Sequence, residues 1–276
     1  MQRNTLVEPR CFHAAVFDSE HGHLILGGSS HLFQGATVSH TVEQQPSSTH
    51  PAMSPRVVAT MLHKRAGHVG SLNSLTRQLV VCGGYGGGSV YHDTVEVMDL
   101  NDASGMNSGF QQLPPMGTRK TGAGGGFGPD GCMYVCGGST NGSDGLTVVE
   151  RLDLRTKQWE TLAPLNCGRG YCSGAWNAEG RLYVAGGSVL QPRNVTLGGT
   201  THTVVSQKTW DTIEMYDARK NDGWHVVVDH KLQVERADLC VVARLMTSSV
   251  GLTSVMKREN PVVDWWQSRR MRTLST

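Results

Sequence analysis

Short apolar runs alternate with polar, glycine-rich segments along most of the chain. Four of these runs end in a Gly-Gly doublet: HLIL (23–26), LVVC (79–82), MYVC (133–136) and LYVA (182–185). Each run has the length of a β-strand that is covered on both faces. The doublets follow one another at intervals of roughly fifty residues, so the pattern predicts one strand that recurs four times.

Two further landmarks follow each doublet in the same order. The first is a short stretch that ends in glutamate: TVE (41–43), TVE (94–96), VVE (148–150) and TIE (212–214). The second is an aromatic residue in three of the units, namely Phe110, Trp159 and Trp224. We expect the two tryptophans to fill the wide gap between neighbouring sheets, where a large ring buries most area.

An arginine followed by small or apolar residues precedes each doublet strand and also begins a fifth, incomplete unit. Hairpin-turn compositions separate these runs from the doublet strands, as in DSEHG (18–22), PDG (129–131) and NAEG (177–180). Each unit therefore predicts four short antiparallel strands. The arginines are Arg10, Arg65, Arg119, Arg169 and Arg236.

A single sheet of this size cannot bury both faces, so the copies must pack face to face, and a ring of radial sheets is the usual solution. The doublets, the glutamate stretch, the aromatic residue and the repeat length together resemble the kelch repeat. The resemblance implies an all-β, kelch-type β-propeller with four recognisable blades and a partial fifth. The expected ranges are 10–62, 63–117, 118–166 and 167–231 for blades 1 to 4, and 232–244 for the start of blade 5.

The pattern fails after Arg236. Residues 237–244 begin a fifth unit that never reaches a doublet, and residues 245–276 form a divergent tail without any landmark. We therefore expect a ring that is incomplete or irregularly closed. In the family resembled, a terminal strand often closes the ring, so the N-terminal segment 1–9 is a candidate closing strand.

Composition narrows the class of partner. The 276 residues include 34 glycines, and only 17% are charged, a balance that suits neither a disordered nor a helical protein. The formal net charge of +2 predicts no nucleic-acid or membrane partner.

The first ten residues lack the apolar core of a secretory signal, and no apolar run of membrane-spanning length occurs. We therefore expect a cytoplasmic protein whose seven cysteines are reduced.

No candidate metal or nucleotide site is complete in the sequence. Cys132 and Cys136 do not have the spacing of a structural zinc site, and His21 and His23 lack a third ligand. The glycine run 122–128 falls at an inner-strand position, and no lysine with serine or threonine follows it, as a phosphate-binding loop would require. We therefore expect no metal and no cofactor.

Two residue types recur at fixed repeat positions and indicate packing. Cys82 and Cys136 share one position, where the other copies have Leu26 and Ala185, so that position accepts any modest apolar side chain. His13 and His68 both lie three residues after a recurring arginine. That recurrence favours a role in blade packing over catalysis.

The recurring arginines lead to two hypotheses. If they hold equivalent positions in successive blades, rotation about the propeller axis gathers their guanidinium groups on one rim, where they could bind an acidic or phosphorylated peptide. In the family resembled, arginines at this point help to line the ligand pocket. Alternatively, each arginine pairs with a recurring glutamate or caps backbone carbonyls between blades. Those glutamates are Glu43, Glu96, Glu150 and Glu214.

The loops after the doublets are expected to determine specificity. They span 29–40, 85–93, 139–147 and 188–211, and the last is long enough to predict an irregular loop that is either functional or disordered. Together with the arginines, these loops supply the candidate partner-binding residues Tyr85, His92, Arg193 and His202.

The preferred hypothesis is a non-enzymatic protein-interaction domain that holds an acidic loop or peptide of a partner on the arginine-bearing face. By resemblance, it could act as a substrate adaptor of a ubiquitin ligase or as a scaffold. The alternative is a carbohydrate-acting enzyme on the same fold, similar to galactose oxidase or to a sialic-acid epimerase. For a copper oxidase, the raw material would be Tyr85, Tyr91, His92, Tyr171 and Cys172, and stoichiometric bound copper would identify it.

Overall fold

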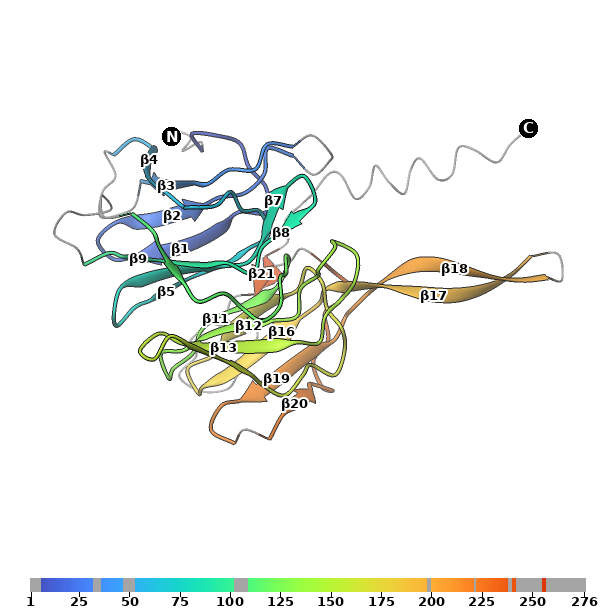
Figure 1. Ribbon diagram of the computed structural model, residues 1–276. Coiled ribbons are helices and arrows are strands. Elements are labelled where there is room, and N and C mark those ends of the chain that lie inside the picture. Colours follow the sequence, from blue (N-terminus) through green and yellow to red (C-terminus); the bar gives the residue numbers. More distant parts are fainter. Residues whose placement is uncertain are drawn as a thin grey trace.

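The fold consists of four antiparallel sheets arranged around one axis (Figure 1). The computed structural model describes residues 6–31, 36–46, 53–101, 109–197, 200–220, 222–237, 240–241 and 255–256. These residues contain strands and no helix, and each main sheet has four strands. The predicted all-β propeller architecture is confirmed.

Each blade runs from an innermost to an outermost strand. Blade 1 contains β1 (Ala14–Asp18), β2 (Gly22–Leu26), β3 (Thr41–Gln45) and β4 (Arg56–Thr60). Blade 2 contains β5 (Val69–Asn73), β6 (Gln78–Cys82), β9 (Val95–Asp99) and β10 (Gln111–Leu113). Blade 3 contains β11 (Gly124–Phe127), β12 (Met133–Cys136), β13 (Val149–Asp153) and β14 (Gln158–Thr161). Blade 4 contains β15 (Ser173–Trp176), β16 (Arg181–Ala185), β19 (Ile213–Asp217) and β20 (Trp224–Val226).

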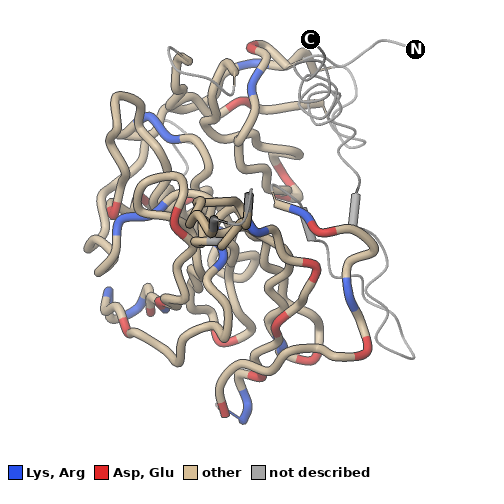
Figure 2. Tube along the Cα trace, turned by 90° about the vertical axis from the view of Figure 1, so that its right-hand side faces the viewer, with Lys and Arg blue, Asp and Glu red and all other residues tan. Residues whose placement is uncertain are grey.

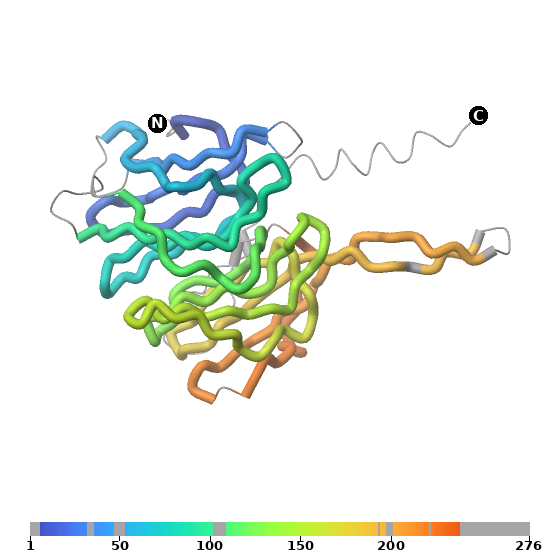
Figure 3. The backbone as a smooth tube through the Cα atoms, viewed as in Figure 1, coloured from blue at the N-terminus to red at the C-terminus, as the bar shows by residue number. Residues whose placement is uncertain are grey.

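Two hairpins are inserted between the second and third strands of their blades. The short one in blade 2 consists of β7 (Tyr85–Gly87) and β8 (Val90–Tyr91). The long one in blade 4 consists of β17 (Ser188–Leu197) and β18 (Thr200–Thr209), which pair antiparallel over their whole length. It extends away from the sheets (Figure 3). The expectation of an irregular loop at 188–211 is therefore wrong.

The innermost strands β1, β5, β11 and β15 lie next to one another in chain order around the axis. The fifth unit begins with β21 (Cys240–Val241), which lies beside β15 and pairs with β22 (Val255–Met256). The rest of the predicted tail 245–276 lies outside the described residues. Of the predicted closing segment 1–9, residues 6–9 form no strand and residues 1–5 are not described. No helix in the described part of the chain could cross a membrane.

Apolar side chains fill the spaces between neighbouring sheets. Leu24 and Leu26 of blade 1 pack with Leu79 and Val81 of blade 2, and equivalent clusters join blades 2 and 3 and blades 3 and 4. The tryptophans lie where the sequence predicts them. Trp159 Nε1 donates to the Pro114 carbonyl at 2.9 Å, and Trp224 Nε1 donates to the Ala163 carbonyl at 3.0 Å, in each case across a blade boundary.

The residue three positions after each recurring basic residue packs against the second glycine of a doublet. His68 is at this position in blade 2, where its Cβ would lie 2.9 Å from a methyl group on Gly84. Its side chain is buried, and within the described residues neither ring nitrogen has a hydrogen-bond partner. Burial lowers the pKa of His68 to about 3, and the neighbouring charge of Arg65 adds to this effect. A packing role, as expected from its recurrence, follows from these contacts.

We expect His68 to make the fold sensitive to mild acid. The unfolded chain binds a proton at His68 near pH 6.5, whereas the folded chain does not until about pH 3, so this contribution is complete above pH 6.5 and is lost as the pH falls below it. As the pH falls from 6.5 to 5, protonation of His68 in the unfolded chain should lower the free energy of unfolding by about 1.5 kcal/mol. Urea denaturation of wild type and His68→Leu over this range measures the difference.

The leucine variant should lose that part of the pH dependence and keep its stability at pH 7.5, because no hydrogen bond is removed. His230→Leu, at an exposed histidine, is the matched control and should follow wild type. Equal pH profiles for wild type and His68→Leu would show that the imidazole is not held neutral.

Candidate functional site

The register of the recurring basic position is fixed by one backbone hydrogen bond per blade boundary. The second glycine of each doublet donates to the carbonyl of the basic residue that opens the next blade. The bonds are Gly28 to Arg65 at 2.7 Å, Gly84 to Lys120 at 2.8 Å, Gly138 to Arg169 at 2.7 Å and Gly187 to Arg236 at 2.7 Å. The basic residue of blade 3 is therefore Lys120 and not Arg119, which is a correction to the sequence prediction.

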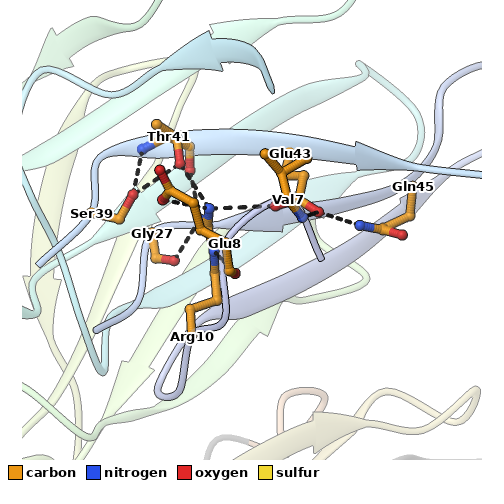
Figure 4. A network of polar contacts seen from close by, with 8 residues as sticks. All are labelled: Val7, Glu8, Arg10, Gly27, Ser39, Thr41, Glu43 and Gln45. Carbon is orange, nitrogen blue, oxygen red and sulfur yellow. Dashed lines mark hydrogen bonds and ion pairs between the residues drawn. The ribbon is translucent and has the colours of Figure 1, made fainter. Parts of the chain in front are cut away.

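The side chains of Arg65, Lys120 and Arg169, and that of Arg10 in blade 1, point into their own blades and pair with the recurring glutamate. In blade 2, Arg65 Nη2 lies 2.5 Å from Glu96 Oε1, and in blade 4, Arg169 Nε lies 2.9 Å from Glu214 Oε1. Lys120 Nζ lies 2.6 Å from Glu150 Oε2. Figure 4 shows the blade 1 copy, in which Arg10 Nη2 lies 3.4 Å from Glu43 Oε2.

The same glutamate also accepts the backbone N–H of the residue three positions before the basic residue. This bond holds the segment that connects two successive blades against the carboxylate of the second blade. The donors are Val7 to Glu43 at 2.8 Å, Leu62 to Glu96 at 2.7 Å, Gly117 to Glu150 at 2.7 Å and Asn166 to Glu214 at 2.6 Å. Burial alone would raise the pKa of Glu96, but Arg65 and these hydrogen bonds outweigh it and hold the pKa below its ordinary value.

This arrangement corrects the hypothesis of a guanidinium rim. The side chains of Arg65 and Arg169 are 0% exposed and that of Arg10 is 2% exposed, so a ligand on the surface cannot reach them. Arg65 Nη1 donates to the doublet carbonyl of Gly83 and to the Thr94 carbonyl, the latter at 3.0 Å, whereas Arg65 Nε has no hydrogen-bond partner within the described residues. The alternative hypothesis, pairing with the glutamates, describes the geometry found for these three residues.

The other predicted partner-binding residues have varied positions, and His92 lies close to the Arg65–Glu96 pair: its ring centroid is 5.3 Å from that of His63, whose Nδ1 lies 2.8 Å from Glu96 Oε1. Arg119 and His202 are exposed, and Arg236 is half-buried. Arg193 lies in β17 opposite Val204, but its side chain is outside the described part of the structure. Tyr85 is the first residue of β7 and His92 directly follows β8, and both are half-buried.

The structure adds an equivalence that the sequence analysis missed, at the second residue after each basic position. This residue has a positive φ in all four blades: Phe12 at 53°, Gly67 at 62°, Gly122 at 63° and Tyr171 at 56°. Backbone bonds connect neighbouring copies, from Gly67 N–H to the Phe12 carbonyl at 2.8 Å and from Gly122 N–H to the Gly67 carbonyl at 2.7 Å. Two blades thus place an aromatic side chain where the other two have glycine.

The rings from blades 1 and 4 meet, although the blades are not neighbours in the chain. The centroids of Phe12 and Tyr171 lie 6.2 Å apart, and those of Tyr85 and Tyr91 lie 5.4 Å apart. The hydroxyls of Tyr91 and Tyr171 both approach Gly142, since a methyl group there would lie 3.0 Å from one and 3.4 Å from the other. We call Phe12, Tyr85, Tyr91 and Tyr171 the aromatic cluster.

Burial and neighbouring side chains set the pKa values of the groups around the aromatic cluster. Burial raises the pKa of Tyr91, and the charges of Tyr85 and Asp144 add to this, so its phenol stays protonated and able to donate a hydrogen bond. Burial alone would raise the pKa of Asp144, but hydrogen bonds from Ser139 and Thr140 outweigh it and lower the pKa. Figure 2 shows the side from which the long hairpin projects, where basic and acidic residues are interspersed.

The residues considered for a copper oxidase are used in other contacts. Cys172 is buried with its Sγ 3.6 Å from the Cys136 carbonyl, and burial raises the pKa of its thiol. His92 Nε2 lies 3.1 Å from the Lys64 carbonyl, and burial lowers the pKa of its imidazole. In the described ranges, no three histidine, cysteine or acidic side chains gather as a metal site would require.

The sequence contains a signal for the inward-pointing basic residues and a signal for the aromatic pair Phe12 and Tyr171. The glutamate stretch begins with Thr41, Thr94 and Thr212 in the arginine-bearing blades, and each threonine hydroxyl accepts from the arginine. In blade 3, Val148 replaces the threonine where lysine replaces arginine. This coupled change indicates direct contact and thus an inward-pointing basic residue. Phe12 and Tyr171 could have been noticed as departures from glycine at one repeat position.

Comparisons with known proteins agree with the repeat. Residues 128–166 match the family model described as the Kelch motif. Among solved structures, the chain is similar to the one titled "Structure of YjhT", with a TM-score of 0.67 and 15% sequence identity over 84% of this chain and 74% of that chain. At this identity the likeness shows the fold alone. No curated protein matches the chain.

Proposed function

Starting from the premise that this chain is a kelch-repeat propeller protein, we propose that it is a non-enzymatic protein-binding module whose partner docks on the aromatic cluster. The observation that supports this is the pair Phe12 and Tyr171, whose rings meet from blades 1 and 4 while both backbones have a left-handed φ. Adaptor or scaffold roles fit such a module and stay predictions.

The left-handed conformation is the main argument. It costs a residue with a side chain on the order of 1 kcal/mol, and the equivalent Gly67 and Gly122 adopt it without that cost. The rings are half-buried, so packing within the fold uses only part of their surface. Tyrosine and phenylalanine offer large, rigid contact area, and tyrosine adds a hydroxyl, which is why such residues dominate protein interfaces.

The surroundings favour binding over catalysis. The cluster has phenol hydroxyls and one acidic neighbour, Asp144, which already accepts hydrogen bonds from Ser139 and Thr140. The imidazole of His92 and the thiol of Cys172 are in contact with carbonyls as described above. These contacts occupy both groups, which disfavours a role for them as acid and base on a bound sugar.

The double variant Phe12→Gly/Tyr171→Gly tests this proposal. Glycine relieves the positive φ at both positions, so we expect the free energy of unfolding to change by no more than about 1 kcal/mol. Binding of the partner should fall by at least about 30-fold, as expected for loss of a hot spot. Quantitative mass spectrometry of proteins captured by the immobilised variants provides the measurement, followed by titration of the purified partner.

Phe17→Ser is the control, because Phe17 is another aromatic residue of blade 1 that has exposed surface but lies at the far end of β1. It should capture the same proteins as wild type. Equal capture by the double glycine variant, or no protein captured specifically by wild type, would contradict the proposal.

A further inference from the structure

The long hairpin β17–β18 is attached only at its base. Ser188 exchanges two backbone hydrogen bonds with Gly170, at 2.7 and 2.8 Å, and Leu190 N–H donates to the Ser143 carbonyl at 3.1 Å. Beyond these contacts, both strands extend away from the blades (Figure 1). A two-stranded hairpin alone is marginally stable in water, so such an extension needs a reason.

The two outer edges of the hairpin differ. The bond from Leu190 to Ser143 shows that Leu190 points its N–H away from β18, and every second residue of β17 does the same. The next of these is Pro192, which has no N–H. The outer edge of β17 is therefore covered at its base and interrupted at Pro192, beyond which Asn194 and Thr196 again point their N–H groups outward.

The outer edge of β18 is open. Val205 is paired with Pro192 and Gln207 with Leu190, so their N–H and C=O groups point outward, and the same alternation applies to Thr201 and Thr203. Within the described residues, none of these groups has a backbone partner on that side. The edge has no proline, bulge or inward charge that would prevent another strand from pairing with it.

The chemistry of the hairpin defines the class of partner. Val204 is 42% exposed and Val205 is 69% exposed, so β18 presents apolar surface on both faces. The segment 188–210 contains no aspartate or glutamate, whereas Arg193, His202 and Lys208 are basic. Lys208 Nζ lies 4.0 Å from the centroid of the Trp210 ring, which holds the ammonium group near the base of β18.

We propose that the outer edge of β18 binds an extended acidic segment of a partner protein, which pairs with it as a third strand. The backbone groups of Thr201, Thr203, Val205 and Gln207 bond the segment, its apolar side chains lie beside the two valines, and its carboxylates lie near Lys208. Charge favours this occupant over a second copy of the chain, since two such hairpins would bring like charges together. The surface is separate from the aromatic cluster, and either can bind without the other.

The test uses a fluorescein-labelled decapeptide of alternating glutamate and valine, titrated into the full chain. Two companion peptides carry lysine in place of glutamate, or N-methyl groups on alternate backbone amides. We expect the acidic peptide to bind, and the lysine and N-methylated peptides to bind at least 10-fold more weakly. Hydrogen exchange should show protection of the amides of Thr201, Thr203, Val205 and Gln207 on addition of the acidic peptide.

Val205→Pro removes one outward N–H and leaves the β17–β18 ladder intact, as Pro192 does on the opposite strand. This variant should bind the acidic peptide at least 10-fold more weakly than wild type. Val205→Thr, which keeps the N–H and the branched shape, should bind it like wild type. The proposal would be overturned if the N-methylated peptide bound as well as the acidic one, if no peptide bound, or if Val205→Pro bound the acidic peptide like wild type. A concentration-dependent dimer through this edge, seen in sedimentation, would overturn it as well.

Discussion

Replacement of Arg169 by alanine is expected to lower the free energy of unfolding by about 3–5 kcal/mol, because it leaves the carboxylate of Glu214 buried without its cation. The glutamate is 0% exposed and cannot recover a hydration shell without opening the blade. The change also removes the hydrogen bonds from Arg169 to the Gly186 carbonyl at 2.7 Å and to Thr212 Oγ1 at 2.6 Å. Guanidinium denaturation followed by tryptophan fluorescence measures the loss.

Arg155→Ala is the matched control. Arg155 is also paired with an aspartate of blade 3, but its side chain is 83% exposed, so we expect a change within about 0.5 kcal/mol. Arg169→Lys should fall between the two, since Lys120 shows that the fold accepts an ammonium group at this position. If Arg169→Ala kept wild-type stability and instead lost partner binding, the guanidinium would belong to a ligand site.

Replacement of Gly83 by alanine is expected to cost more than about 3 kcal/mol, because it combines backbone strain with a clash. Gly83 has a φ of +67°, and a methyl group there would lie 2.5 Å from the Lys120 carbonyl oxygen. That carbonyl accepts the bond from Gly84 that joins blades 2 and 3, so it cannot move away without separating the blades. Thermal unfolding by circular dichroism measures the effect.

Gly109→Ala isolates the contribution of the backbone. Its φ of +70° is close to that of Gly83, but no atom lies within 4 Å of a methyl group at this position. It should cost only about 1 kcal/mol, the strain of the left-handed conformation itself. Similar losses in the two variants would mean that close approach between blades does not explain the doublet.

Much of the fold could be predicted because its signals are local and repeated. The four apolar runs coincide with β2, β6, β12 and β16, and the doublets end these strands. Strand length, turn composition and glycine conformation depend on neighbouring residues in the chain, so a single sequence displays them.

The long hairpin shows a missed local signal. Runs rich in valine and threonine lie on both sides of Gly198-Gly199, a composition typical of a two-residue hairpin turn. Length alone suggested an irregular loop, whereas the pairing of ten residues in each strand satisfies the backbone along the segment. Its open edge on β18 followed only from the direction of the Leu190 N–H.

The candidate site was harder to predict because knowing that residues are equivalent does not tell in which direction their side chains point. The spacing indicated that the recurring basic residues occupy equivalent positions, but both an axial and an inward direction are compatible with that spacing. Inward pairing prevails because a glutamate and, in three blades, a threonine lie within reach on the third strand. The one-residue shift from Arg119 to Lys120 became visible through the Gly84 bond.

The sequence by itself determined the repeated four-stranded unit, its boundaries at glycine and its apolar interior, since these properties arise from residues close together in the chain. Only the tertiary structure decided which side chains meet around the axis. Phe12, Tyr91 and Tyr171 belong to three different blades, and the angle between successive sheets brings the rings of Phe12 and Tyr171 together and the hydroxyls of Tyr91 and Tyr171 to the same glycine, Gly142. That angle results from packing over the whole interface between sheets, and no short segment of the sequence encodes it.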